Sequence, residues 1–441
     1  MASPVTRKLF GTDGVRGVAG DFLTADLALG LGRAAAAVSP AEKPQVLIVR
    51  DTRESGEMLE AALAAGVAAA GGHALLGGVL PTPGAALLVR RYGFDLAAVV
   101  SASHNPYKDN GIKFFGPEGT KLSDEHEAEI ERVLEAPEAA PPPGRVRELH
   151  GAAGDYLREL EARFHGLDLA GTNVLLDCAN GATYRVAPEI FRRLGATVAA
   201  IATEPDGRNI NDGVGSTHVE ALAESVRSGG HDLGFAFDGD GDRVLAVDRK
   251  GVVVDGDELI ALAALHLRER DALPGGGVAV TVMTNYGFHK AMEAASIAVA
   301  TTNVGDRYVL AELLKRGWAL GGEQSGHIID TGFVPSGDGV AAALLTLEAL
   351  KGGDLADRGA MRKLPQRLVN VRIGDRGALD DAKGVWKAVD EESARLEGRG
   401  RVLVRPSGTE PLVRVMVEAP DAAECDQVVE RLVETVQREL A

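Results

Sequence analysis

Cysteine and aromatic residues are scarce in this sequence of 441 residues. Cys178 and Cys425 are its only cysteines, and they lie far apart along the chain. A disulfide framework or a thiolate metal site is therefore not expected, and this cysteine usage is typical of the reducing cytoplasm. Because aromatic residues make up only 4% of the chain, we expect cores built mainly from Ala, Val and Leu.

The sequence also lacks a basic excess and a long apolar run. Its formal net charge of −17 argues against nucleic-acid binding, because contact with the phosphate backbone needs a basic face. The weakly charged stretch 61–88 is interrupted by Gly71-Gly72, Pro81 and Pro83, so it is not expected to cross a membrane. The N-terminus has no apolar segment like that of a signal peptide. We therefore expect a cytoplasmic protein with neither nucleic acid nor membrane as a partner.

Three parts of the chain share one pattern, in which an apolar β-branched run, a polar loop, a helical stretch and a second apolar run follow one another. The first copy begins at residues 46–50, the second at 173–177 and the third at 278–282. Strand–helix–strand units of this length predict parallel or mixed sheets. The sequence therefore predicts three related α/β domains.

The end of the chain has a different pattern. Runs 401–405 and 412–417 predict a hairpin, and residues 422–439 predict a helix, which together make an α+β module. The proline run within residues 139–144 predicts an exposed connection. The predicted domains are residues 1–150 with a serine loop, 151–253 with an acidic loop, 254–365 with a glycine-rich loop and 366–441 with an arginine loop.

The acidic loop, Asp238-Gly-Asp-Gly-Asp-Arg243, is the sharpest chemical signal. Asp238, Asp240 and Asp242 alternate with glycines, so their carboxylates can converge on one hard cation such as Mg²⁺ or Ca²⁺. An EF-hand is excluded, because Arg243 and Arg249 stand where that loop needs Gly and Glu. A solvated acidic loop without metal is the plain alternative. Arg243 is suited to contact phosphate oxygens beside a bound metal.

The serine loop, Ser101-Ala-Ser-His-Asn-Pro106, follows the apolar run 96–100. Either Ser101 or Ser103 can be a nucleophile, although most segments of this kind are ordinary turns. The chain has no Gly-x-Ser-x-Gly motif, which argues against a serine hydrolase. A serine that carries phosphate beside a carboxylate-bound metal is chemically consistent, since the metal neutralises phosphoryl oxygens and Lys113 can assist charge or proton transfer.

Two further loops carry groups that suit a phosphorylated sugar. In the glycine-rich loop, Glu323 and Ser325 can hydrogen-bond to sugar hydroxyls, and a plain turn with a satisfied His327 is the alternative. In residues 405–410, together with Arg414, guanidinium groups, hydroxyls and a glycine amide can bind an anion. An ordinary hairpin turn with exposed arginines is the alternative for this arginine loop.

These four loops and residues 10–17 (Phe-Gly-Thr-Asp-Gly-Val-Arg-Gly) resemble the motifs of the α-D-phosphohexomutase superfamily, in the expected order and over nearly the whole chain. Gln324 and the segment 215–218 are similar to the glucosamine branch of that superfamily. The resemblance implies an α/β fold of four domains around a central cleft, in which three related mixed-sheet α/β domains precede a C-terminal α+β domain.

The resemblance also implies roles for individual residues. Ser103, rather than Ser101, carries the transferable phosphate as phosphoserine, and it binds one Mg²⁺ per chain together with Asp238, Asp240 and Asp242. Contact with the transferred phosphate is implied for Arg16, Lys113 and Arg243, and acid–base chemistry for His327 or Lys113. Contact with the sugar hydroxyls is implied for Glu323 and Ser325. Distal phosphate binding is implied for Arg405, Ser407, Gly408, Thr409 and Arg414.

The implied activity is that of an isomerase. Phosphoserine 103 gives its phosphoryl group to glucosamine 6-phosphate, and the resulting glucosamine 1,6-bisphosphate, which also acts as an activator, returns its other phosphoryl group. Glucosamine 1-phosphate then leaves for UDP-N-acetylglucosamine synthesis. Asp306 stands where some relatives have a histidine, so the general acid and base stay open.

Two alternatives remain beside this activity. Phosphomannomutase or phosphoglucomutase activity is the alternative within the superfamily, and a non-catalytic phosphosugar-binding protein is a remote one. In each case the expected partner is a small phosphosugar, and the protein is a monomer or a homodimer.

Overall fold

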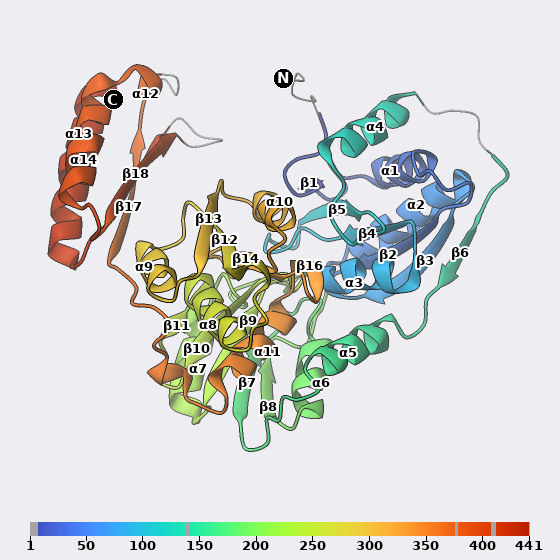
Figure 1. Cartoon of the computed structure of the whole chain (residues 1–441). Coiled ribbons are helices and arrows are strands. Elements are labelled where there is room, and N and C mark those ends of the chain that lie inside the picture. Colours follow the sequence, from blue (N-terminus) through green and yellow to red (C-terminus); the bar gives the residue numbers. More distant parts are fainter. Residues whose placement is uncertain (1–7, 137–140, 375–377, 407–411, 441) are drawn as a thin grey trace. The chain divides into compact units, whose positions relative to one another are not determined.

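Figure 1 shows the computed structural model of the chain, which describes residues 8–136, 141–374, 378–406 and 412–440. The chain divides into two compact units. The large unit comprises Met1–Val282 and Ile297–Arg358, and the small unit comprises Met283–Ser296 and Gly359–Ala441.

The first sheet of the large unit, blue to teal in Figure 1, has six strands in the order β1-β5-β4-β2-β3-β6. The strands are β1 (Val15–Val18), β2 (Gln45–Arg50), β3 (His73–Val79), β4 (Leu96–Val100), β5 (Asp109–Phe115) and β6 (Arg145–Glu148). Strand β2 pairs in parallel with β3 and β4, whereas β5 pairs antiparallel with β1 and β4. The sheet is therefore mixed, as the sequence predicts.

Four helices belong to this sheet, α1 (Ala25–Ala37), α2 (Gly56–Ala69), α3 (Thr82–Tyr92) and α4 (Asp124–Glu135). Helices α1, α2 and α4 share one core with the sheet, to which they contribute Leu31, Leu63 and Ile130. The strands contribute Val46 and Ile48 to the same core. Aliphatic residues dominate this core, which agrees with the scarcity of aromatic residues in the sequence.

The second and third sheets have five strands each, in the orders β11-β10-β9-β7-β8 and β13-β12-β14-β15-β16. The second contains β7 (Asn173–Asp177), β8 (Thr197–Ile201), β9 (Leu233–Phe237), β10 (Val244–Asp248) and β11 (Val253–Val254). The third contains β12 (Gly277–Thr281), β13 (Ala298–Thr302), β14 (Leu320–Gly322), β15 (Ile328–Asp330) and β16 (Val334–Gly337). Both sheets combine parallel and antiparallel pairs.

The helices that accompany these two sheets are α5 (Ala152–Arg163), α6 (Val186–Arg193), α7 (Glu220–Gly229), α8 (Gly256–Glu269), α10 (Asp306–Arg316) and α11 (Gly339–Leu350). Within the described residues, no helix combines the length and the apolar character needed to cross a bilayer.

The small unit is built on a three-stranded antiparallel sheet in the order β17-β19-β18. Its elements are α9 (Tyr286–Ala294), β17 (Gln366–Arg372), α12 (Ala378–Asp381), α13 (Lys383–Arg395), β18 (Arg401–Pro406), β19 (Leu412–Glu418) and α14 (Ala422–Leu440). Residues of α13 and α14, such as Val385 and Leu432, share a core with Val404 and Val415 of the sheet.

The fold class predicted from the sequence is confirmed, with three mixed-sheet α/β layers followed by an α+β module. The predicted hairpin is β18–β19, and β17 pairs with β19 as a third strand. The arrangement of domains around a central cleft involves both units and stays a prediction.

Helix α11 begins at a buried carboxylate. Asp338 accepts a hydrogen bond from the Ala341 N–H at 2.9 Å, and its two oxygens lie 2.9 and 3.0 Å from the Tyr156 hydroxyl, which donates. Burial raises the pKa of Asp338 to about 6. Because this folded-state pKa lies above the unfolded value of about 4, the folded chain binds the proton more tightly. The charged form therefore destabilises the fold above about pH 6, and this cost disappears as the pH falls toward about 4.

We expect Asp338→Asn to raise the thermal midpoint at about pH 8, because an amide keeps the hydrogen-bond acceptor without the buried charge. The gain is up to about 3 kcal/mol, since the pKa rises from 3.8 to about 6 and each pKa unit corresponds to about 1.4 kcal/mol. Melting both proteins between about pH 4.5 and about pH 8 measures the effect, which should shrink to about a third of its full size at the acidic end, because about pH 4.5 still lies above the unfolded pKa. A gain independent of pH would contradict the raised pKa.

Candidate active site

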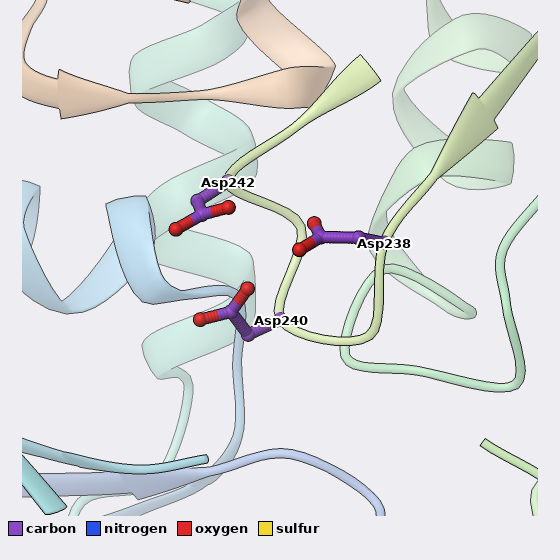
Figure 2. A group of neighbouring side chains, drawn as sticks. All are labelled: Asp238, Asp240 and Asp242. Carbon is purple, nitrogen blue, oxygen red and sulfur yellow. The ribbon is translucent and has the colours of Figure 1, made fainter. Parts of the chain in front are cut away.

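The acidic loop connects the neighbouring antiparallel strands β9 and β10 of the second sheet. Asp238, Asp240 and Asp242 are all buried, and one oxygen atom of each lies within 4.8 Å of the others. Figure 2 shows the three carboxylates pointing toward one another from this one loop. The alternating spacing in the sequence therefore does bring the three side chains together.

The three carboxylates fit a hard divalent cation. Among the described residues, Asp240 Oδ1 and Asp242 Oδ1 are buried without a hydrogen-bond partner. Burial, together with the charges of Asp242 and Asp240, raises the pKa of Asp238 well above its usual range. Carboxylate oxygens are the ligands that Mg²⁺ prefers, and a divalent cation would offset their mutual repulsion. The loop could therefore hold one such ion.

The serine loop lies against the acidic loop. Ser103 is buried, and its Oγ donates to Asp238 Oδ2 at 2.6 Å although the two residues are far apart in the sequence. Its φ of 52° is a left-handed conformation that residues other than glycine rarely adopt and that often marks functional sites. Gly239 permits the close approach of the acidic loop to the serine loop, because a Cβ at that position would lie 2.6 Å from Ser103 O.

Ser101 has a different environment from Ser103. Its Oγ donates to Asp51 Oδ2 at 2.5 Å and accepts from the Ser103 N–H at 3.0 Å. Ser101 is completely buried, and both of these hydrogen bonds support the loop. The geometry therefore favours Ser103, whose hydroxyl contacts the acidic loop, as the reactive serine.

Arg53 holds the serine loop in place, and the sequence motifs did not point to it. Its guanidinium is completely buried and pairs with Asp51 at 2.8 Å. It also donates to three carbonyl oxygens of the loop, those of Ser103 (2.8 Å), Asn105 (2.9 Å) and Pro106 (2.5 Å), and to that of Asp109 at the start of β5 (3.0 Å). A signal was available, because Asp51-Thr-Arg53 directly follows the first predicted strand. Strands β2 and β4 are parallel neighbours, so the loops after them meet at one edge of the sheet.

Lys113 on β5 supplies a buried positive charge beside the acidic loop. Its Nζ lies 2.6 Å from Asp240 Oδ2 and 3.6 Å from Asp13 Oδ2. Burial opposes this charge, but Asp13 and Asp240 hold the pKa of Lys113 well above its usual range. Thr82 at the start of α3, a residue that the motifs did not indicate, donates to the same Asp240 oxygen at 2.7 Å. Lys113 is therefore a charged neighbour of the carboxylates, and a role in proton transfer stays a prediction.

Two arginines add positive charge near the serine loop. Arg16 on β1 pairs with Asp13, and Arg243 Nε lies 3.8 Å from Asp242 Oδ1. Within the part of the chain that the structure describes, the buried Nε of each arginine has no hydrogen-bond partner. Burial, and then the charges of Arg243 and Arg16, lower the pKa of His104 on the serine loop. Partly buried guanidinium groups with spare donors suit an anion such as a phosphoryl group.

His327 is enclosed by protein groups. Its side chain is 4% exposed, and its Nδ1 lies 3.6 Å from Asp242 Oδ2. Its Nε2 accepts a hydrogen bond from the Gly337 N–H at 3.1 Å and lies 3.7 Å from Asp306 Oδ2. These surroundings favour a supporting role beside Asp242, and acid–base chemistry by His327 stays a prediction.

The glycine-rich loop connects β14 and β15 and lies next to the end of the acidic loop. Val244, the first residue of β10, donates its N–H to Gly326 O at 3.0 Å. Glu323 is partly exposed and Ser325 is exposed, so both side chains are available to a ligand. Glu323 Oε1 accepts from the Gly305 N–H at 2.9 Å, which fixes one of its oxygens.

The predicted distal phosphate residues belong to the small unit. Arg405 on β18 and Arg414 on β19 are register partners on neighbouring strands. Burial and the charge of Arg414 lower the pKa of Arg405, as expected for two cations held close together. Ser407, Gly408 and Thr409 lie outside the described residues. Binding of a phosphate at this loop stays a prediction.

A serine hydroxyl held against a set of carboxylates, with lysine and arginine beside them, is suited to phosphoryl transfer. Four family models match the chain in order, those of phosphoglucomutase/phosphomannomutase α/β/α domain I (residues 7–140), domain II (154–251), domain III (255–376) and the C-terminal domain (368–435). The chain belongs to the phosphoglucomutase/phosphomannomutase family.

Curated relatives match nearly the whole chain. A phosphoglucosamine mutase of Moorella thermoacetica is 52% identical over 432 residues, which cover 96% of this chain and 97% of the relative. A phosphoglucosamine mutase of Bacillus subtilis is 47% identical over 444 residues, which cover 98% of this chain and 99% of the relative.

Solved structures share the fold. A phosphoglucomutase/phosphomannomutase family protein from Burkholderia thailandensis has a TM-score of 0.82 at 24% identity, with 98% of this chain and 97% of that chain covered. The N-acetylphosphoglucosamine mutase of Aspergillus fumigatus, solved in complex with GlcNAc-6P and magnesium, has a TM-score of 0.69 at 19% identity, with 100% of this chain and 97% of that chain covered. At these identities the likeness shows the fold alone.

We expect Mg²⁺ to raise the thermal midpoint of the protein, because a ligand that binds the folded state stabilises it by about 2.7 kcal/mol at about one hundred times its Kd. Asp240→Asn should abolish this rise. Asp271→Asn, at an exposed position of the same unit, is the matched control and should keep it. Melting curves in EDTA and in Mg²⁺ measure the difference, and an equal rise in both variants would place the cation elsewhere.

We expect Arg53→Lys to loosen the serine loop, because an ammonium group cannot replace the planar set of guanidinium donors. Turnover of a hexose phosphate should fall by on the order of 100-fold, and amide exchange in the serine loop should become faster. Arg50→Lys is the control, since Arg50 pairs with Glu57 and Glu60 on α2, and it should lose less than about 3-fold. Similar losses in both variants would reduce the role of Arg53 to general stability.

Proposed function

We propose that the protein is an isomerase that interconverts glucosamine 6-phosphate and glucosamine 1-phosphate. The observation that carries this proposal is the 2.6 Å contact between Ser103 Oγ and Asp238 Oδ2. It joins the serine and acidic motifs in one buried site, in a chain that is 47–52% identical to proteins named phosphoglucosamine mutase. Phosphomannomutase or phosphoglucomutase activity is the alternative within the family.

The reaction has two halves that share Ser103. In the first half, the bond between phosphoserine Oγ and phosphorus breaks while the C1 oxygen of glucosamine 6-phosphate bonds to that phosphorus. The C1 hydroxyl loses its proton and Ser103 Oγ gains one, so charge and atoms balance. In the second half, the 6-phosphoryl group of the 1,6-bisphosphate moves to Ser103 and the C6 oxygen takes the proton. Glucosamine 1-phosphate then leaves and is available for UDP-N-acetylglucosamine synthesis.

The acidic loop and the cations around it supply the electrostatics of both halves. Asp238, Asp240 and Asp242, with an oxygen of the phosphoserine, would hold one Mg²⁺. When bound, this ion neutralises charge on the phosphoryl oxygens. Arg16 and Arg243 add donors for the same oxygens. Lys113 holds Asp240 in place through their 2.6 Å ion pair.

The substrate is held at both ends. Glu323 and Ser325 hydrogen-bond to sugar hydroxyls, and the phosphate that is not reacting binds to Arg405, Ser407, Gly408, Thr409 and Arg414. Because the bisphosphate must turn round between the two halves, this distal site has to accept either phosphate. Catalysis then depends mainly on positioning and on charge neutralisation.

The remaining proposals come from the sequence. The chain is divided into domains 1–150, 151–253, 254–365 and 366–441, which carry the serine, acidic, glycine-rich and arginine loops. The protein acts in the cytoplasm as a monomer or homodimer, with glucosamine 1,6-bisphosphate as its activator.

Sugar selectivity tests the proposed function. With Mg²⁺, a bisphosphate activator and protein whose phosphorylation is verified by intact mass, kcat/KM should be highest for glucosamine 6-phosphate among this sugar, glucose 1-phosphate and mannose 1-phosphate. Ser103→Ala should lack both the phosphoryl mass and turnover, whereas Ser101→Ala should keep the phosphoryl mass.

Each contrary outcome has a separate meaning. Equal or better use of glucose 1-phosphate or mannose 1-phosphate would keep the phosphoserine mechanism and overturn the substrate. A phosphoryl mass that persists in Ser103→Ala would remove Ser103 from the mechanism. No turnover of any sugar would favour a phosphosugar-binding protein.

A further inference from the structure

A chain of alternating charges leads away from the acidic loop. Lys113 Nζ, which pairs with Asp240, also lies 3.6 Å from Asp13 Oδ2. Asp13 in turn pairs with Lys121, and Lys121 Nζ donates to Asp306 Oδ2 at 2.6 Å. None of these side chains is more than 23% exposed, so solvent screens the pairs only weakly. The ion pair of Lys121 and Asp306 thus ends a chain of contacts that begins at the acidic loop.

The far end of this chain reaches the loop that holds Glu323. Asp306 is the first residue of α10, and the preceding Gly305 donates its N–H to Glu323 Oε1 at 2.9 Å. Gly305 has a φ of 131°, which residues with a side chain rarely adopt. Because Lys121 anchors Asp306, the backbone that presents this N–H is tied to the first sheet of the large unit. The position of the Glu323 carboxylate therefore depends on the ion pair.

We propose that Lys121 and Asp306 are positioning residues that hold Glu323 at a set place relative to the acidic loop. Through Gly305, the pair connects the carboxylate assigned to the sugar hydroxyls with the carboxylates assigned to the metal. This inference rests on the proposed function and adds to it the contacts that align the sugar with the phosphoryl group. Misplacement of a bound reactant by about 1 Å can cost on the order of 100-fold in rate, so such alignment has a measurable effect.

The neighbouring Arg307 provides a control that separates the positioning of Glu323 from the mere attachment of α10 to the rest of the unit. Its Nη1 pairs with Asp124, and its Nη2 lies 3.2 Å from Glu127 Oε1. Both acids belong to α4, so Arg307 joins α10 to the first α/β layer, as the pair of Lys121 and Asp306 does. It makes this connection through α4 instead of through the chain of charges that starts at the acidic loop.

The first experiment compares Lys121→Met, Asp306→Asn and Arg307→Met in phosphorylated, Mg²⁺-loaded protein. We expect kcat/KM for glucosamine 6-phosphate to fall by on the order of 30-fold in the first two variants. In Arg307→Met, kcat/KM should fall by less than about 3-fold. The thermal midpoint of this variant should nevertheless fall by about as much as those of Lys121→Met and Asp306→Asn. If kcat/KM fell in proportion to the thermal midpoint in all three variants alike, the proposal would be overturned.

The second experiment tests whether Lys121 acts through Glu323. In a Glu323→Gln background, Lys121→Met should lower kcat/KM by less than about 5-fold, because the group that it positions is already impaired. In an Arg414→Ala background, which alters the distal phosphate site, the effect of Lys121→Met should keep its full size of about 30-fold. Effects of the same size in both backgrounds would show that Lys121 does not act through Glu323.

Failure of the proposed function can be recognised separately in the unmodified protein. Turnover of another hexose phosphate in place of glucosamine 6-phosphate would overturn the substrate, and the same comparisons made with that sugar would still decide the inference. If no sugar is turned over, the dissociation constant of glucosamine 6-phosphate, measured by calorimetry for the same variants, replaces kcat/KM. A weaker affinity in Lys121→Met and Asp306→Asn, but not in Arg307→Met, would then support the positioning role, and equal affinities would overturn it.

Discussion

The mutual repulsion of three buried carboxylates is the constraint on which the large unit depends. Asp238, Asp240 and Asp242 place oxygen atoms within 4.8 Å of one another, and like charges this close cannot all stay ionised without compensating cations or polar neighbours. Lys113 from the first sheet meets Asp240 at 2.6 Å, and His327 from the third sheet lies 3.6 Å from Asp242. The acidic loop of the second sheet is therefore stable in this form only where groups from all three sheets surround it, which makes the site a product of the whole unit.

The functional groups come mostly from loops at strand ends, carried on sheets that hold them still. The serine loop follows β4, the Asp51–Arg53 turn follows β2, and the glycine-rich loop follows β14. Because neighbouring parallel strands end at one edge of a sheet, Arg53 can reach three carbonyl groups of the serine loop and that of Asp109, the first residue of β5. The left-handed backbone of Ser103 is held by these bonds, so the strain at this serine is offset by a buried guanidinium outside every recognisable motif.

Motifs whose chemistry is local could be recognised in the sequence. Alternating aspartates predicted a cation site, and the structure brings their oxygens together. The local sequence left Ser101 and Ser103 open, because both stand in the same short loop. The resemblance to the superfamily implies Ser103, and the tertiary contacts also distinguish the two serines, since Ser101 faces Asp51 and Ser103 faces Asp238. Lys121 had no motif signal of its own, because its importance lies in Asp13 and Asp306, which are distant along the chain.

The sequence by itself determined the fold class, the family and the four chemical loops. Hydrophobic periodicity and the residue types within a loop are properties of neighbouring residues, which is why they can be recognised without coordinates. The tertiary structure alone decided the hydrogen-bond partners of each serine, the distances of the cations from the carboxylates, and how Glu323 is connected to the acidic loop. These features depend on distances between residues far apart in the chain, and such distances are set by how the sheets pack together.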